Sequence, residues 1–242
     1  MIIDFHSHVL PGIDDGSKDT KMSMQMLSMA GSQGVDVMIA TPHFYSWRHR
    51  VDDFLSRRTA SYEHLMDVIG QQDPAQTKNY PKILLGAEVA YFDGISKAER
   101  LDDLRIQGTN ILLLEMSFEP WSPNMLKEVE YLIRRRGYTI VLAHLERYLR
   151  IKENRLLIEK IMTLPLEVQV SADSLTGFFY NKDAMMWLKE GKARILASDA
   201  HNTDKRKPNL LDGREAIEKR AGREVLEQID RTSSEMLQEL FH

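Results

Sequence analysis

The sequence predicts an α/β fold, a (β/α) barrel in a single domain over residues 1–242. Seven short runs rich in Ile, Val and Leu are apolar at consecutive positions, which is typical of parallel strands buried on both faces. Longer amphipathic segments separate these runs, and seven strand–helix alternations favour a barrel over an open doubly wound sheet. An open nucleotide-binding sheet would carry a glycine-rich loop, and neither a GxGxxG motif nor a P-loop occurs.

The expected strands are the seven brief apolar runs, namely Met1–Phe5, Val35–Ala40, Ile83–Val89, Ile111–Met116, Thr139–Ala143, Leu166–Val170 and Ala193–Ala197. The expected helices lie between them, at Lys21–Ser32, Val51–Ile69, Pro123–Arg136, Arg155–Met162, Lys182–Glu190 and Leu211–Ala221. A helical tail, Glu224–Phe241, is expected to be interrupted near Arg231–Ser233. The polar stretch Gln71–Pro81 holds two prolines and is expected to be a loop.

The composition excludes several classes of protein. The 43% hydrophobic and 28% charged fractions are ordinary for a soluble globular chain. The net charge of −4 provides no overall basic field, so we expect no nucleic-acid partner. The chain has no cysteine, which excludes disulfides, thiolate metal sites and a cysteine nucleophile.

The N-terminal stretch MIIDFHSHVLPG has neither the basic nor the long apolar region of a signal peptide. No apolar run approaches the roughly 20 residues that a membrane-spanning helix needs. We therefore expect a cytoplasmic protein without membrane insertion, although it could still act on a membrane-bound partner. The lack of cysteine agrees with a reducing compartment.

Almost every expected strand ends in a histidine or a carboxylate. The carboxyl ends of the strands of a parallel βα barrel emerge on one face, where active sites are built from several strands. His6 and His8 are two apart on an extended segment, so their side chains point the same way and can clamp one ion. The candidate metal ligands are His6, His8, Asp15, His43, Glu88, Glu115, His144, Asp199 and His201.

A single histidine at a strand end is more often an ordinary surface or hydrogen-bonded residue than a ligand. The occurrence of such residues at the ends of six strands favours a metal site instead, with two or three ions and a bridging carboxylate. Imidazole and carboxylate ligands without thiolate suit Mn²⁺, Fe or Zn²⁺, and a multi-metal cluster indicates hydrolysis. His49, His64 and His242 lack this placement and are expected at the surface.

Two arginines point to a phosphorylated substrate. Arg147 follows His144 by three residues, Arg206 follows His201 by five, and a guanidinium matches phosphate oxygens with two hydrogen bonds. Either could be a solvated loop cation, but their closeness to expected ligands favours a catalytic role in a phosphoesterase. The aromatic and basic segment Phe44–Arg50 could be a substrate-facing loop, an ordinary surface loop or an oligomer contact.

The motifs HSH, TPH, GAE, LLE, AHLER and ASDAH resemble the PHP (polymerase and histidinol phosphatase) superfamily. FHSHVLPGIDDGS, GAE, AHLERY and ILASDAHN followed by Arg206 resemble its bacterial protein-tyrosine phosphatase branch, which is encoded with polysaccharide genes. The resemblance spans about residues 1–240. It implies a distorted seven-stranded (β/α) barrel, with one metal on His6, His8, Glu88 and Asp199, a second on Glu88, Glu115 and His144, and a third on Asp15, His43 and His201.

The same resemblance implies that Arg147 and Arg206 hold the phosphate and that the metal is Mn²⁺, with Fe or Zn open. The implied substrate is phosphotyrosine on the tail of a bacterial tyrosine kinase that regulates polysaccharide synthesis or export. Members of the family can assemble into oligomers. The alternatives are a histidinol-phosphate or other small-molecule phosphatase of the same fold, a nuclease or polymerase-editing module, and a metal-stabilised scaffold that binds a kinase without hydrolysis.

Overall fold

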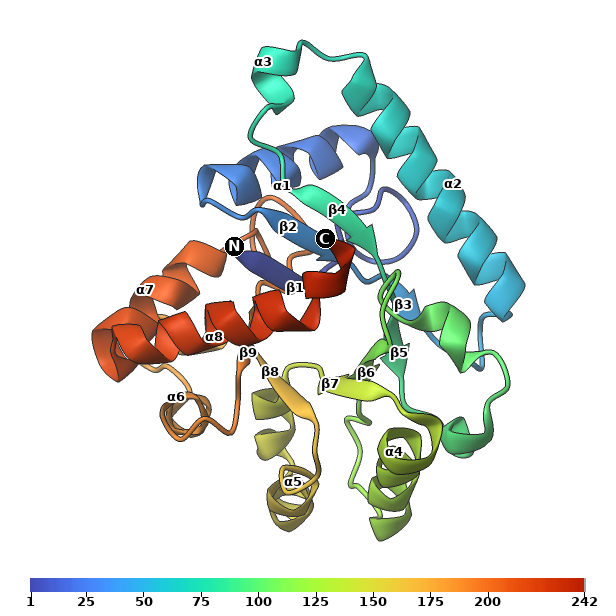
Figure 1. Ribbon diagram of the computed structural model, residues 1–242, viewed down its shortest axis with the longest axis vertical. Helices are drawn as coiled ribbons and strands as arrows, with labels where there is room; N and C mark the ends of the chain where they lie inside the picture. Colours follow the sequence, from blue (N-terminus) through green and yellow to red (C-terminus); the bar gives the residue numbers. More distant parts are fainter. Residues whose placement is uncertain (242) are drawn as a thin grey trace.

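The structure is a computed structural model and describes residues 1–241. Parallel strands lie at its centre and helices surround them (Figure 1). One sheet has three strands in the order β1-β2-β4, and the other has six in the order β3-β5-β6-β7-β8-β9. The strands are β1 (Ile3–Ser7), β2 (Val37–Ala40), β3 (His43–Phe44), β4 (Lys82–Leu85), β5 (Glu88–Ala90), β6 (Ile111–Glu115), β7 (Thr139–Leu142), β8 (Glu167–Ser171) and β9 (Ile195–Ala197).

The α/β class with parallel sheets is confirmed, and the single seven-stranded barrel is not, because nine strands form two sheets. The second expected strand corresponds to β2, which pairs with β4 as far as Ala40. After Pro42, which has no N–H to donate, the short strand β3 pairs with β5 instead. The third expected strand divides at Gly86 into β4 and β5. Both interruptions lie beside candidate ligands, His43 and Glu88, which open β3 and β5.

The two sheets are joined in space. Ser7 forms a parallel bridge with Ala200, and the N–H of His8 donates to the carbonyl of Ala200 at 2.8 Å. Strands of both sheets also line one interior apolar cluster, which Leu237 closes from the C-terminal segment. The strand residues of this cluster are Ile3, Phe5, Val37, Ile39, Leu84, Ile111, Leu113, Val141, Ile195 and Ala197.

Helices pack on the outer side of the strands over a second, larger apolar cluster. They are α1 (Thr20–Ser32), α2 (Val51–Gly70), α3 (Pro74–Thr77), α4 (Pro123–Arg136), α5 (Arg155–Ile161), α6 (Lys182–Lys189), α7 (Leu210–Ala221) and α8 (Arg223–Met236). Short 3₁₀ segments are η1 (Ile95–Lys97), η2 (Leu101–Leu104), η3 (Leu145–Arg150), η4 (Lys152–Asn154), η5 (Ala172–Leu175) and η6 (Gln238–Leu240).

Two expectations about these helical segments are wrong. The stretch Gln71–Pro81 is not entirely a loop, because Asp73 accepts from the N–H of Ala75 and caps the short helix α3. The interruption expected near Arg231–Ser233 is absent, and α8 continues to Met236 with Ser233 buried. Burial of one face of α8 against the strands outweighs the weak helix propensity of Thr and Ser.

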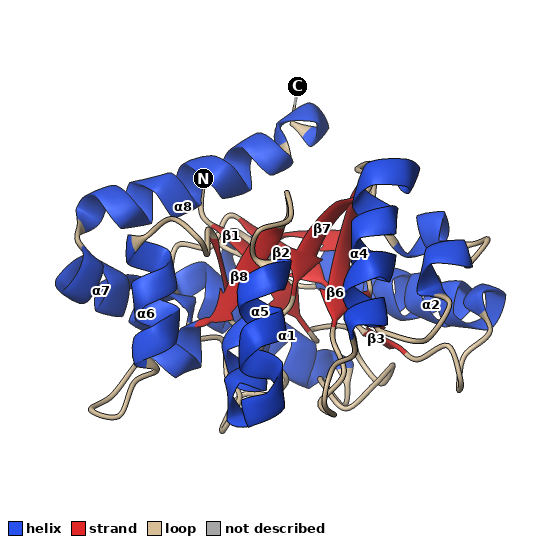
Figure 2. Cartoon of the chain, turned by 90° about the horizontal axis from the view of Figure 1, so that it is seen from below, coloured by secondary structure: helices blue, strands red, loops and turns tan. Residues whose placement is uncertain are grey.

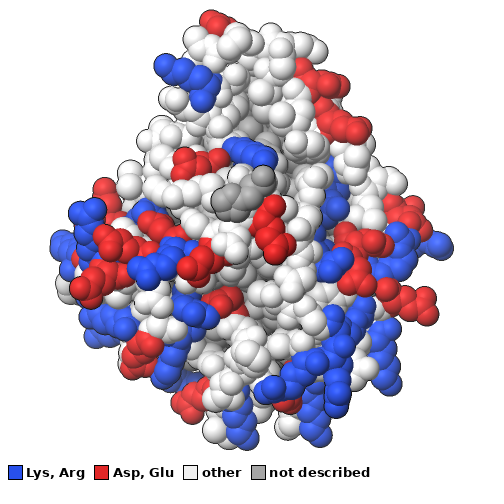
Figure 3. All heavy atoms as spheres, in the orientation of Figure 1, with Lys and Arg blue, Asp and Glu red and all other residues white. Residues whose placement is uncertain are grey.

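The two ends of the strands differ in what covers them. Helix α8 crosses the amino end, where both chain termini also lie, and the loops that follow the strands form the opposite end (Figures 1 and 2). Acidic and basic side chains are interspersed over α7 and α8 on the face of the amino end (Figure 3). Within residues 1–241, no helix is both long enough and apolar enough to cross a bilayer.

Candidate metal centre

The nine candidate ligands lie at or after the carboxyl ends of β1, β2, β4, β6, β7 and β9, and their ligand atoms fall into overlapping groups. In each group the atoms lie within 4.8 Å of one another. The groups are His6-His8-Asp199, His6-Glu88-His144, His43-Glu88-Glu115 and His8-Asp15-His43-His201. His6, His8, His43 and Glu88 each belong to two of these groups. The nine side chains therefore form one continuous cluster that could hold metal ions.

Gln169 on β8 fixes the tautomer of His6. The Gln169 Oε1 atom lies 3.1 Å from the backbone N of His144, which can only donate, so this atom accepts. The same Oε1 lies 3.1 Å from Nδ1 of His6, so Nδ1 carries the proton. The Nε2 atom of His6 therefore presents a lone pair to the cluster.

Asp14 fixes the tautomer of His8 in the same way. Its Oδ2 accepts from Nδ1 of His8 at 2.7 Å and from the backbone N–H of His43 at 3.0 Å. Its other oxygen accepts from the N–H of Gly16, which closes the turn after β1. His201 is fixed by its own chain, because its Nδ1 donates to the carbonyl of Asp199 at 2.9 Å.

These tautomers place lone pairs in contact with one another. The Nε2 atoms of His6 and His8 are 3.1 Å apart, and Oε2 of Glu88 lies 3.2 Å and 3.4 Å from them. Nε2 of His201 is buried without a hydrogen-bond partner in the described chain, and Nδ1 of His43 and Oε2 of Glu88 are buried 2.9 Å apart without hydrogen-bond geometry between them. Such a set of buried acceptors is costly unless a cation lies among them, so the residues present fit a metal cluster.

Glu88 lies at the centre of the cluster. One of its oxygens is 2.9 Å from Nε2 of His144, and the other is 2.9 Å from Nδ1 of His43. Burial raises the pKa of this carboxyl, but electrostatic attraction to the imidazole of His6, the hydrogen bond with His144 and the close contact with His43 outweigh burial and hold the pKa well below its usual range. Glu88 is therefore ionised at neutral pH and can bridge two sites.

Asp199 connects the cluster to both arginines. Its Oδ1 lies 3.5 Å from the ring nitrogens of His6 and His8, while its Oδ2 accepts from Nη2 of Arg147 at 2.5 Å and from Nη2 of Arg206 at 2.7 Å. The two guanidinium groups thus converge on one point at the edge of the cluster.

Local backbone structure explains why these two arginines return to the cluster. Arg147 lies one 3₁₀ turn after His144, and its N–H donates to the His144 carbonyl at 3.0 Å. In the other loop, the side chain of Asn202 accepts from the N–H groups of Asp204 and Arg206, which bends the chain back. The N–H of His201 then donates to the carbonyl of Arg206 at 2.8 Å.

Backbone strain is concentrated at the same place. Among the described residues, the non-glycine residues with positive φ are His144 at 34° and Asp199 at 51°. This region is unfavourable for residues with a Cβ atom, and such residues gather at functional sites.

The segment Phe44–Arg50 lies beside the cluster. The ring of Tyr45 stacks on His43 with 5.1 Å between centroids, and Trp47 is 62% exposed. Tyr45 and Arg48 line a cavity of about 380 Å³, whose wall also includes the candidate ligands Asp15 and His43. The segment therefore borders the approach to the cluster.

The three remaining histidines differ in placement. His64 is exposed on α2, as expected. His49 lies at the surface with its ring partly buried, and its Nδ1 accepts from the N–H of Tyr45 at 3.2 Å. His242 lies outside the described residues.

The sequence patterns do not predict three residues that support the cluster, namely Asp14, Gln169 and Asp4. Asp4 is buried beneath the cluster, where it accepts from the N–H and the hydroxyl of Ser198. Burial raises its pKa to about 6, although the hydrogen bonds with Ser198 oppose this shift. The signal for Asp14 was present in the Asp14-Asp15 pair, but Asp4 and Gln169 stand inside strands without any motif.

The comparisons with known proteins decide the family. The family model described as capsular polysaccharide synthesis, CpsB/CapC, matches residues 2–238. The chain belongs to the CpsB/CapC family. The chain is 28% identical over 228 residues to the tyrosine-protein phosphatase YwqE of Bacillus subtilis, covering 93% of this chain and 87% of that one. It is 25% identical over 236 residues to the tyrosine-protein phosphatase CpsB of Streptococcus pneumoniae, covering 91% of each.

A solved structure agrees in fold. Crystal structures of YwqE and CpsB, described as unique metal-dependent tyrosine phosphatases, include a chain that superposes on this CpsB/CapC member with a TM-score of 0.84. The match covers 98% of this chain and 94% of that chain at 24% identity. The α/β architecture is therefore shared over almost the whole length.

Proposed function

We propose that this protein is a metal-dependent protein-tyrosine phosphatase that hydrolyses phosphotyrosine with manganese as its cofactor. The observation that carries the proposal is the convergence of Arg147 and Arg206 on Asp199 beside a cluster of buried lone pairs. Two guanidinium groups next to a metal cluster are suited to a phosphoryl group and to the charge that develops on it during transfer.

The proposed ligand assignment is the one that the family resemblance implies, and it divides the contact groups differently. The first ion would take His6, His8, Glu88 and Asp199, the second Glu88, Glu115 and His144, and the third Asp15, His43 and His201. The contacts between Glu88 and His6, between Glu115 and His144, and between Asp15 and His201 support this division. Imidazole and carboxylate ligands suit Mn²⁺, and Fe or Zn²⁺ are the other ions that fit this set. When bound, the ions supply a nucleophile at neutral pH and Lewis-acid stabilisation of phosphoryl charge.

The residues of the chain position the substrate. Arg147 and Arg206 are catalytic residues. When substrate binds, their guanidinium groups donate to the phosphoryl oxygens instead of to Asp199, and they hold the phosphoryl group for in-line displacement. The absence of cysteine closes the thiolate route, so no cysteinyl phosphate forms. The leaving phenolate, with an ordinary pKa of about 10, departs toward the open side bordered by Tyr45 and Arg48.

The proposed substrate is a phosphotyrosine protein, the tail of a bacterial tyrosine kinase that regulates polysaccharide synthesis or export. The relatives named tyrosine-protein phosphatase and the capsular family description support this substrate. The proposal places the reaction in the cytoplasm. It also treats the two sheets as one interrupted, distorted barrel, which the bridge between Ser7 and Ala200 supports.

The alternative substrate class is histidinol phosphate or another small phosphomonoester. Comparison of kcat/KM for a phosphotyrosine peptide and for histidinol phosphate, with Mn²⁺ present, separates the two. We expect the peptide to be strongly preferred, because the cavity beside the cluster is open and bordered by Tyr45. A preference for histidinol phosphate would contradict the proposed substrate and leave the metal site intact.

A further inference from the structure

The most exposed large apolar side chains of the described residues are Phe178 and Phe179, with 90% and 95% of their surface exposed. They are adjacent in the loop between η5 and α6, and their rings are nearly perpendicular with 5.1 Å between centroids. An exposed aromatic pair of this kind marks an interaction surface.

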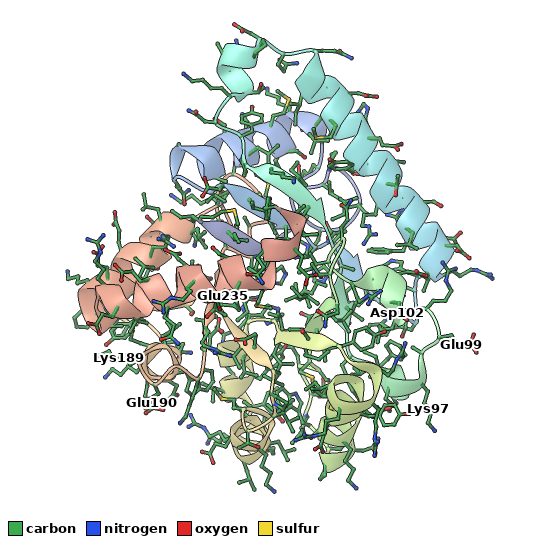
Figure 4. The ribbon with its side chains drawn as sticks, viewed as in Figure 1. Lys97, Glu99, Asp102, Lys189, Glu190 and Glu235 are labelled. Carbon is green, nitrogen blue, oxygen red and sulfur yellow. The ribbon has the colours of Figure 1, made fainter. Side chains whose placement is uncertain are left out.

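The Phe178-Phe179 tip lies at the same end of the molecule as the metal cluster. It precedes α6, and Lys189 and Glu190 mark the other end of that helix (Figure 4). The loop that enters α6 projects at the end opposite α8 (Figure 2). The remaining large apolar side chains that are more than half exposed also follow carboxyl ends of strands, namely Trp47, Phe118 and Leu156.

The tip is held in place by its neighbours. Arg220 on α7 donates from Nη2 to the carbonyl of Gly177 at 3.1 Å, and its guanidinium lies 4.4 Å from the centroid of Tyr180. The N–H of Asn181 donates to the carbonyl of Ser174 at 2.7 Å and closes the base of the loop. The two phenylalanines therefore stand on an anchored, convex projection.

The loops around the tip are basic. The loops after β7, β8 and β9, which are neighbours in the sheet, carry five exposed cations and three exposed carboxylates. The cations are Arg150, Lys152, Lys205, Arg206 and Lys207, and the carboxylates are Glu153, Asp173 and Asp204. The excess of positive charge contrasts with the net charge of −4 of the whole chain.

We propose that this end of the molecule binds peripherally to the surface of an anionic lipid bilayer, with Phe178 and Phe179 inserted among the headgroups. Aromatic side chains bury their rings at this interface, while lysine and arginine are attracted to anionic lipids. A short peptide binds in a groove or along a free strand edge of the protein that recognises it, and the convex tip offers neither. The proposal does not depend on the chemistry of the metal site.

Vesicle sedimentation with the full, metal-loaded chain tests this proposal. We expect binding to vesicles of phosphatidylcholine mixed with phosphatidylglycerol, weaker binding to phosphatidylcholine alone, and release as salt rises. The double variant Phe178→Ser/Phe179→Ser should lower the affinity for anionic vesicles by more than about tenfold. Lys205→Ala/Lys207→Ala should also weaken binding, while Met66→Ser, at an exposed apolar position on α2, serves as the matched control and should not.

A direct readout of insertion uses Phe178→Trp, whose added fluorescence should be quenched by vesicles with brominated acyl chains. Hydrolysis of a small phosphotyrosine peptide in solution should stay unchanged in the Phe178→Ser/Phe179→Ser variant. Equal vesicle binding by this variant and the parent, or no binding to anionic vesicles, would overturn the proposal. If the variant bound vesicles as the parent does but hydrolysed a phosphotyrosyl protein more slowly, the proposal would be overturned and the tip would be a binding site for a polypeptide. Loss of a dimer in the variant, without an effect on vesicles, would assign it to a second copy of this chain.

Discussion

Oε1 of Gln169 accepts a hydrogen bond from Nδ1 of His6 at 3.1 Å, in a part of β8 that is fully shielded from solvent. The bond fixes which nitrogen of His6 carries the proton and therefore which nitrogen faces the metal cluster. A neutral side chain without catalytic chemistry thus orients a proposed ligand.

Replacement of Gln169 by Leu should weaken metal binding. The variant keeps the size of the side chain and removes the acceptor, so His6 can take the wrong tautomer and the N–H of His144 loses its partner. We expect a loss of roughly 10- to 100-fold in metal affinity. Metal titration by calorimetry measures this, and nitrogen chemical shifts of His6 report the tautomer. Gln72→Leu, at the end of α2, is the control, and equal metal affinity in the two variants would refute the role of Gln169.

Replacement of Arg147 or Arg206 by Lys should lower kcat/KM for a phosphotyrosine peptide by about 100-fold or more, because a lysine cannot make the two-pronged contact. Metal content should stay close to that of the parent, since neither arginine is a ligand. Arg150→Lys is the matched control, an exposed arginine in the same loop as Arg147. Turnover within a few-fold of the parent in both variants would remove the arginines from the proposed mechanism.

Metal affinity should rise with pH. Burial lowers the pKa of His144 in the metal-free chain, but hydrogen bonds with Glu115 and Glu88 outweigh burial and raise the pKa to about 9. A metal ion binds the neutral ring, so at neutral pH it must displace this proton. The apparent affinity should therefore strengthen by about tenfold per pH unit for each displaced proton, until the pH passes the pKa of His144.

Calorimetric Mn²⁺ titration in two buffers of different ionisation enthalpy measures the protons released. Release should be present at neutral pH and should fall as the pH approaches the pKa of His144, which is about 9. Binding that releases no proton at neutral pH would contradict the charge state assigned to this ring.

Leu237→Ala should destabilise the fold without disturbing the cluster. Leu237 is fully buried in the interior apolar cluster and directly follows α8, the helix that crosses the amino end of the strands (Figure 2). We expect a loss of roughly 2–5 kcal/mol in the free energy of unfolding, measured by denaturant titration. Leu211→Ala is the control, because Leu211 is 38% exposed. An equal loss in both variants would show that the interior cluster is not a principal source of stability.

The candidate ligands could be predicted because their chemistry follows from residue type and strand position. The spacing of His6 and His8 on an extended segment needs no tertiary information, and the other ligands follow apolar runs that parallel pairing brings to one end. The family resemblance assigned them to individual ions, which spacing alone could not do.

The supporting residues and the strand breaks could not be predicted in the same way. Gln169 and Asp4 act through partners 163 and 194 positions away, His6 and Ser198, and a polar residue within an apolar run has no distinctive local pattern. The division of the third expected strand at Gly86, and the additional short strand β3 after Pro42, depend on which neighbouring strand each segment pairs with. Such pairing is set by the whole fold rather than by the local sequence.

The most direct test of the account is the dependence of phosphotyrosine hydrolysis on bound metal in the parent protein and in the variants His43→Ala and Asp199→Ala. Chelation should abolish hydrolysis by the parent, and Mn²⁺ should restore it as two or three ions bind per chain. Each variant should bind fewer ions and should lose nearly all turnover at saturating Mn²⁺. Near-normal hydrolysis by either variant, or by the parent after complete removal of metal, would contradict the account.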